Sequence, residues 1–254
     1  MKRKIFSVLF ALVLVLSFSL VTAVPAGAQD EQPDAIVFPF ELDGKTEGNY
    51  VAEYSTTQVH GGSSSIHLQT TGTVGTGDEA RIRIDFSAFP EGEMPTLGDI
   101  ETISWWEYLV EGYPPHIDIY VDIDDDGTAD DALVIEYAYN SMDHVTAGWP
   151  TYGAVPGDWF QTFGDDGEGP TVIDDGDYAW LTSRAAGPVG GDFGDDDHWG
   201  TTLGDWKAGK TTPAGDISAD TVVTAFEIEV DNWIVQSEAY MPPTITLALG
   251  YSVR

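Results

Sequence analysis

The chain has 254 residues, no cysteine and a formal net charge of −33 at pH 7, with 43 acidic residues against 10 Lys and Arg. This charge excludes nucleic acids and anionic membrane surfaces as partners, because both repel a polyanion. The absence of cysteine excludes disulfides and thiolate metal sites, so packing and bound ions must stabilise the fold.

The N-terminus has the three parts of a secretory signal peptide. Three basic residues at 2–4 precede an apolar run that begins at Ile5, and Ala26-Gly27-Ala28 offers a small-residue cleavage site. The sequence therefore predicts a signal peptide over residues 1–28, cleaved after Ala28, and a secreted, extracellular protein. An uncleaved membrane anchor is the alternative, because the apolar run can be extended to Val24.

A short linker over residues 29–35 leads into a single predicted domain over residues 36–254, which is long enough to bury a large core. Period-two alternation of apolar and polar residues recurs in this domain at 81–86, 117–123, 133–139, 226–231 and 244–249. The 28 glycines and 14 prolines of the chain punctuate these segments. The pattern predicts an all-β fold, an antiparallel two-sheet β-sandwich.

The most specific motif is the acidic stretch Asp122–Asp131, which places carboxylates at loop positions 1, 3, 5 and 9 and a glycine at position 6. Calcium prefers about six to eight oxygen ligands, and a short loop can supply them when a glycine permits the sharp bend. The predicted cofactor is Ca²⁺. Its predicted ligands are the side chains of Asp122, Asp124, Asp126 and Asp130 and the main-chain carbonyl of Thr128.

This loop is not an EF-hand, because position 12 is Leu133 and both flanks alternate with period two. It resembles the calcium hairpin loops of integrin-type propeller repeats, although a single copy does not predict a propeller. An acidic, solvated turn without an ion is the alternative. Repulsion of about 1 kcal/mol per close carboxylate pair favours a bound cation.

Residues 147–212 form a predicted loop-rich insertion that is rich in Gly, Asp and aromatic residues. Aromatic rings that stand in loops can stack on the faces of sugars. The ligand-binding candidates are Trp149, Tyr152, Trp159 and Trp199. The alternative is that these rings belong to the core, since Trp is highly buried on average. Trp105 and Trp106 are adjacent in a predicted strand, so they should point to opposite faces.

The catalytic candidates are three carboxylates on one face of the strand at 226–231, namely Glu227, Glu229 and Asp231. Two close carboxylates could serve a glycosidase. The alternative is a solvated strand face. The five histidines show no spacing typical of a zinc site.

Three further segments carry a resemblance to a known family. They are Phe40-Glu41, the segment from His60 to Leu68 (His-Gly-Gly-Ser-Ser-Ser-Ile-His-Leu), and the closing strands expected at 226–235 and 239–249. Together they resemble the jelly-roll carbohydrate-binding modules of secreted glycosidases. In those modules acidic residues near the start of the last strand help to bind a structural calcium, whereas here Tyr240 is followed by Met-Pro-Pro. The resemblance implies a jelly-roll or concanavalin-like sandwich and carbohydrate recognition.

The sequence thus predicts a secreted, calcium-binding β-sandwich that binds a neutral polysaccharide or glycan without catalysis. One alternative is a structural or adhesive protein of an extracellular surface layer or matrix, and a second is a glycoside hydrolase of jelly-roll fold. A binding module should show an exposed aromatic row. A structural protein should show exposed edges or apolar patches, and a hydrolase should show paired buried carboxylates.

Overall fold

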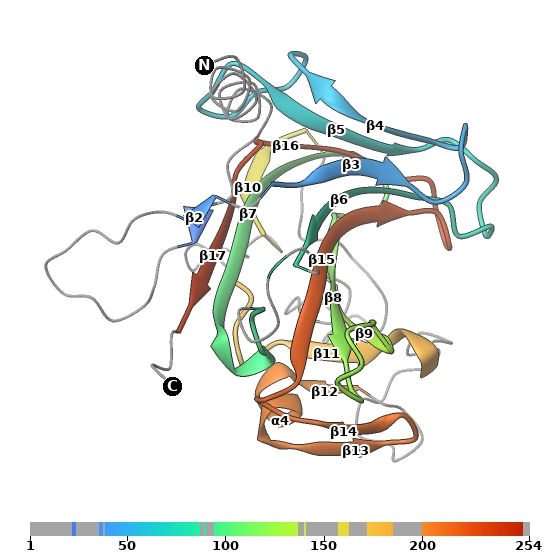
Figure 1. Cartoon of the computed structure of the whole chain (residues 1–254). Coiled ribbons are helices and arrows are strands. Elements are labelled where there is room, and N and C mark those ends of the chain that lie inside the picture. The colour runs from blue at the N-terminus through green and yellow to red at the C-terminus, as the bar shows by residue number, and fades with distance from the viewer. Residues whose placement is uncertain are drawn as a thin grey trace, which may run out of the picture.

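The computed structural model describes residues 22–23, 36–37, 39–86, 89, 94–136, 140, 157–162, 172–184 and 200–250. Two β-sheets form the body of the molecule (Figure 1). The strands within these ranges pair antiparallel, apart from one parallel pair at the edge of the first sheet. The predicted all-β, antiparallel two-sheet sandwich is therefore confirmed.

The first sheet is built around the long strand β7 (Ile100–Glu111). In spatial order its strands are β2 (Ile36–Val37), β1 (Thr22–Ala23), β17 (Ile245–Leu249), β7, β16 (Glu238–Met241), β5 (Ser65–Thr70) and β4 (Tyr50–Ser55). The short strand β10 (Trp159–Gln161) also pairs with β7.

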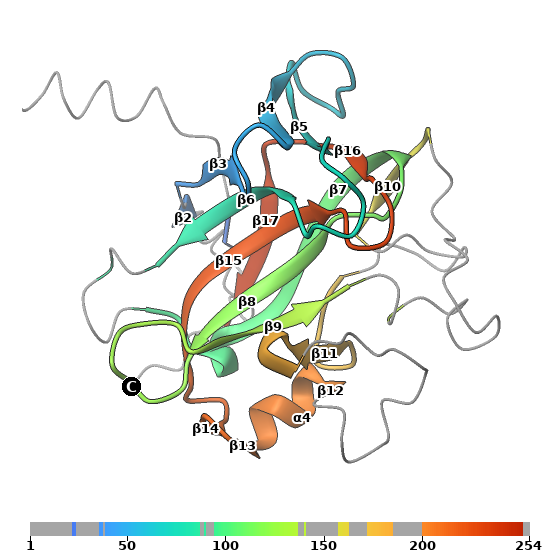
Figure 2. The same ribbon diagram turned by 90° about the vertical axis from the view of Figure 1, so that its right-hand side faces the viewer.

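The second sheet has β15 (Val222–Asp231) and β8 (His116–Asp122) at its centre. Its order is β12 (Gly200–Thr202), β11 (Tyr178–Leu181), β9 (Asp131–Ile135), β8, β15, β6 (Glu79–Asp85) and β3 (Glu41–Gly44). Figure 2 looks onto this sheet, with β6, β15, β8 and β9 lying side by side.

The remaining elements are short and lie at the ends of the sheets. They are the helical turns η1 (Leu97–Asp99) and η2 (Thr182–Arg184), the helix α4 (Leu203–Ala208) and the hairpin of β13 (Lys210–Thr212) and β14 (Gly215–Ile217). Within the described ranges no helix has the length and apolar character needed to cross a bilayer.

The core lies between the two sheets and follows the period-two pattern of the sequence. From β6 it takes Ile82 and Ile84, which are buried, while Arg81 and Arg83 on the same strand point away from it. Apolar residues of β5, β7, β16 and β17 complete the cluster from the other sheet. The two adjacent tryptophans of β7 face opposite ways as predicted, with Trp105 2% exposed and Trp106 37% exposed.

The closing strands differ from their predicted bounds. β15 ends at Asp231, ahead of the exposed residues Trp233 and Ile234. The strand predicted over 239–249 is two strands, β16 and β17, both of which pair with β7. Two prolines at 242 and 243 separate them, because proline cannot donate a main-chain hydrogen bond to a sheet.

Two predictions about chain organisation stay untested. The whole predicted linker lies outside the described residues, and of the predicted signal peptide only Thr22–Ala23 is described. The described parts of residues 147–212 form the short elements β10, β11, η2, β12, α4 and β13.

Candidate functional site

The Asp122–Asp131 stretch closes the hairpin of β8 and β9, as predicted from its flanks. Asp122 is 3% exposed, and its carboxylate accepts hydrogen bonds from the main-chain N–H groups of Asp126 at 3.2 Å and Gly127 at 2.8 Å. Gly127 has a φ of +86°, which only glycine adopts without cost. The loop therefore curls around the Asp122 side chain.

A second aspartate organises the other side of the loop. The Oδ2 atom of Asp130 accepts hydrogen bonds from the main-chain N–H groups of Ile123 at 2.7 Å and Asp124 at 3.2 Å. Ligand oxygens of Asp122, Asp124 and Asp130 lie within 4.8 Å of one another. Desolvation, followed by the charges of Asp126 and Asp130, raises the pKa of Asp124. Three of the five predicted calcium ligands are thus brought together.

The other two predicted ligands, Asp126 and Thr128, are hydrogen-bonded to each other. Asp126 Oδ1 accepts a hydrogen bond from the Thr128 main-chain N–H at 2.9 Å, so this carboxylate faces its own turn. Calcium ligands stand about 2.3 to 2.6 Å from the ion, and a rotation of the Asp126 side chain would be needed for it to join the cluster.

A row of aromatic rings crosses the outer face of the first sheet. The strand register creates this row. Tyr108 of β7 lies opposite Tyr240 of β16 on one side and Trp159 of β10 on the other. Directly paired residues share a face of the sheet. His67 of β5 lies opposite Tyr240. The aromatic row consists of Trp106, His60, Trp159, Tyr108, Tyr240 and His67.

Neighbouring rings of the aromatic row are in contact throughout. His60, from the loop between β4 and β5, stacks on Trp106 with ring centroids 4.3 Å apart and lies 4.9 Å from Trp159. The centroid of Tyr108 is 5.6 Å from that of Trp159 and 6.5 Å from that of Tyr240, which stacks on His67 at 4.5 Å. Strands β10, β7, β16 and β5 carry the row (Figure 1).

Polar side chains border the row at its β5 end. Glu238 Oε1 lies 3.0 Å from His67 Nε2, and Glu238 Oε2 accepts a hydrogen bond from Gln69 Nε2 at 3.1 Å. Burial raises the pKa of Tyr240, and the charge of Glu238 adds to this effect. The row therefore combines apolar ring surface with hydroxyl, amide and carboxylate groups.

Of the predicted ligand-binding aromatics, Trp159 is half-buried and belongs to this row. Trp149, Tyr152 and Trp199 lie outside the described residues. The sequence reasoning missed the other five rings, because they come from segments at 60, 67, 106–108 and 240 that only the sheet brings together. The alternation of Trp106, Tyr108 and Val110 along β7 was the available signal.

The catalytic candidates lie on the outer face of the second sheet, and the solvated strand face considered for them is wrong. Glu227 is 0% exposed and Glu229 4% exposed, whereas Asp231 is half-buried at the end of β15. Burial raises the pKa of Glu229 to about 7, although its hydrogen bond with His116 opposes the change.

Glu227 lies beside two arginines. Its carboxylate forms ion pairs with Arg83 and with Arg81, the latter at 3.1 Å, and accepts a hydrogen bond from the Tyr120 hydroxyl at 2.8 Å. Three donors therefore meet one buried carboxylate, and charge-assisted hydrogen bonds of this kind are stronger than neutral ones. The donors to Glu227 and the imidazole beside Glu229 thus engage both carboxylates in this structure.

Comparison with known proteins gave distant similarities to solved structures. No protein-family model matches the chain, and no curated protein matches it. Among solved structures, it is similar to a family 11 carbohydrate-binding module from Clostridium thermocellum in complex with a β-1,3-1,4-mixed-linked tetrasaccharide. The identity is 10%, the TM-score is 0.43, and the alignment covers 92% of this chain and 100% of that chain. Values this low carry no inference about what the chain binds.

Proposed function

We propose that this chain is a secreted, non-catalytic carbohydrate-binding protein, and that the aromatic row is its glycan-binding surface. The observation that carries the proposal is the continuous contact between six rings on one sheet face. Ring faces bind the C–H faces of sugars, while neighbouring amides and carboxylates form hydrogen bonds with sugar hydroxyls.

The net negative charge of the protein indicates which kind of glycan it would bind. Glu238 lies beside His67 at the β5 end of the row, and the exposed Glu53 of β4 lies opposite His67 in the register. The chain as a whole carries a net charge of −33. An acidic polysaccharide would be repelled, so a neutral polysaccharide is the expected ligand.

Secretion and calcium complete the proposal. The predicted signal peptide would export the chain, and an exported protein without cysteine gains stability from a bound ion. Calcium in the β8–β9 hairpin would screen the repulsion between Asp122, Asp124 and Asp130. The hairpin is separate from the aromatic row, which lies on the other sheet.

The test is a glycan array probed with the wild-type protein in millimolar calcium, followed by titration of the best ligand against variants. Trp106→Ala and Trp159→Ala should each weaken binding about tenfold, since losing one stacked ring costs about 1 to 1.5 kcal/mol. Trp233→Ala is the matched control, because Trp233 is a 57% exposed ring outside the row. If no neutral glycan binds, or if all three variants bind equally, the proposal fails.

A structural or adhesive role is the second candidate, and an exposed apolar patch favours it. Val74, Trp233 and Ile234 are exposed by 48%, 57% and 54%. Their loops are tied together because the Gly75 N–H donates a hydrogen bond to the Asn232 carbonyl at 2.7 Å. This role predicts concentration-dependent self-association that Trp233→Ala abolishes, as measured by sedimentation velocity.

A further inference from the structure

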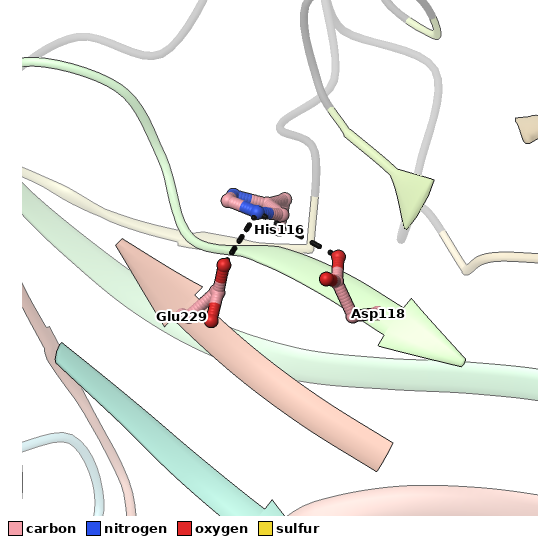
Figure 3. A group of neighbouring side chains, drawn as sticks. All are labelled: His116, Asp118 and Glu229. Carbon is pink, nitrogen blue, oxygen red and sulfur yellow. Dashed lines mark ion pairs between the residues drawn. The ribbon is translucent and has the colours of Figure 1, made fainter. Parts of the chain in front are cut away.

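A buried cluster on the outer face of the second sheet has the residue types of a metal site. The register of β15 against β8 places Glu229 directly opposite His116, and Asp118 lies two residues further along the same face of β8. His116 Nε2 is 3.2 Å from Glu229 Oε1 and 3.8 Å from Asp118 Oδ1 (Figure 3). Ligand atoms of all three side chains lie within 4.8 Å of one another.

Two oxygens of this cluster have no hydrogen-bond partner among the residues that the structure describes. Asp118 is 6% exposed and Glu229 4% exposed, and within these residues no donor reaches Asp118 Oδ1 or Glu229 Oε2. Almost all buried polar atoms in native proteins are satisfied, and an unpaired buried carboxylate oxygen costs several kcal/mol. The unpaired Asp118 Oδ1 faces the His116 ring (Figure 3), and this ring also faces Glu229, so two carboxylates share one imidazole.

The nearby Lys and Arg side chains that the structure describes do not form ion pairs with Asp118 or Glu229. Arg81 and Arg83 form ion pairs with Asp43, Glu79, Asp85 and Glu227, and Lys45 pairs with Glu79. In the part of the chain that the structure describes, Asp118 and Glu229 form ion pairs with His116 and with no Lys or Arg. One imidazolium neutralises one carboxylate, whereas a divalent cation neutralises both and bonds to the neutral ring as well.

We propose that His116, Asp118 and Glu229 bind a divalent transition-metal ion, of which Zn²⁺ is representative. Nitrogen and oxygen ligands about 2.0 to 2.2 Å from zinc stand about 3.0 to 3.5 Å from one another. The separation of 3.2 Å lies within this range, and that of 3.8 Å is slightly longer. An imidazole ligand favours zinc and similar ions over calcium and magnesium.

The ion would act as a structural cross-link between the two central strands of the sheet. All three ligands are less than 9% exposed. Strands β8 and β15 are far apart in the sequence, so a metal that joins them stabilises the folded state by mass action. This zinc site is distinct from the calcium hairpin, because His116 begins β8 and Asp122 ends it.

The experiment is isothermal titration of ZnCl₂ into chelator-treated, dialysed full-length chain in millimolar calcium, which saturates the oxygen-only hairpin. We expect one Zn²⁺ per chain. X-ray absorption of the zinc-loaded wild-type protein should show a shell at about 2.0 to 2.1 Å with scattering from a single imidazole. This measurement needs no variant, so it tests the site even if substitution impairs folding. Absence of zinc binding, or a zinc shell without imidazole, overturns the proposal.

The zinc affinities of substituted proteins then test which residues bind the ion. Asp118→Asn and Glu229→Gln keep the shape of the side chains but remove the charged ligands, and each should weaken zinc binding by about 100-fold or more. Asp216→Asn, which removes an exposed carboxylate on β14, is the matched control for charge and should bind zinc as the wild type does. Asp124→Ala should also leave zinc binding unchanged. If Asp124→Ala removes zinc while Asp118→Asn retains it, the ion belongs to the hairpin and the proposal is wrong.

Discussion

At the scale of single residues, Glu107 is the most unusual group of the core. It lies on β7 between Trp105 and Leu109 and shares their inward face, with an exposed fraction of 0%. Glu107 Oε2 accepts a hydrogen bond from Trp105 Nε1 at 3.2 Å, whereas Oε1 has no hydrogen-bond partner among the described residues. Burial raises the pKa of Glu107 well above its ordinary value, and the bond from Trp105 opposes this only in part.

Glu107→Gln should therefore stabilise the protein at high pH. Because the folded-state pKa is raised, the contribution of Glu107 is fully present below about pH 4.5 and is lost as the pH rises through the folded-state pKa. Gln stays neutral, so the variant should match the wild type near pH 4 and be about 1 to 3 kcal/mol more stable near pH 8. Urea unfolding at both pH values measures the difference.

Glu101→Gln is the control for this measurement, since Glu101 is exposed on the same strand. Its effect on the free energy of unfolding should be small at both pH values. A Glu107→Gln effect that does not change between pH 4 and pH 8 would show that the pKa of Glu107 is the same in the folded and unfolded states.

The sequence could not have revealed Glu107 as a core residue. Both faces of β7 are largely apolar. Trp105 and Leu109 lie on one face, and Trp106, Tyr108 and Val110 lie on the other. Period-two alternation predicts which face of a strand is buried only when the residues of the other face are polar. The adjacent tryptophans could be predicted to diverge, but which of them faces inward was decided by packing against the second sheet.

At the scale of elements, the β8–β9 hairpin was the best-predicted part of the chain, because all its determinants are local. Alternation on both flanks and Gly127 in a ten-residue segment were enough to predict the connection. The His116 cluster and the aromatic row were not predictable in this way. Each depends on strand register, such as Glu229 opposite His116, which no short segment encodes.

The hairpin gives a prediction about calcium. Replacing Asp124 and Asp126 together with Ala should lower the melting temperature in millimolar calcium by about 3 to 6 °C. This follows from about 1.4 kcal/mol of binding energy at a dissociation constant near 10⁻⁴ M. In chelator the variant should be at least as stable as the wild type, because carboxylates that repel one another have been removed. Differential scanning calorimetry with and without calcium measures both effects.

Asp125→Asn provides the matched control in the same loop. Asp125 has a φ of +61°, a conformation that asparagine also tolerates, and it occupies a position that is not a predicted ligand. The Asp125→Asn substitution should therefore not reduce the rise in melting temperature that calcium causes. Equal melting temperatures for wild type and the double variant, with no calcium detected by titration, would remove the calcium site from the proposed function.

At the scale of the whole molecule, the alternation of apolar and polar residues was sufficient to predict the sandwich, while the charge distribution needed the structure. Among the described Lys and Arg residues, Arg81 and Arg83 of the second sheet pair with the half-buried Asp43 and the buried Glu227. The exposed acidic residues are left largely uncompensated, because 43 Asp and Glu face only 10 Lys and Arg. Their mutual repulsion must destabilise the folded state.

The last prediction follows from this imbalance. In chelator, raising NaCl from about 0.01 M to about 1 M shortens the screening length from about 30 Å to about 3 Å, so repulsion between surface carboxylates should largely disappear. Exposed ion pairs such as Lys45–Glu79 weaken as well, but each contributes only about 0 to 1 kcal/mol. The melting temperature should therefore rise by several degrees, as measured by circular dichroism. The same rise with choline chloride would identify screening as the cause, whereas a fall in melting temperature would show that attractive pairs outweigh the excess negative charge.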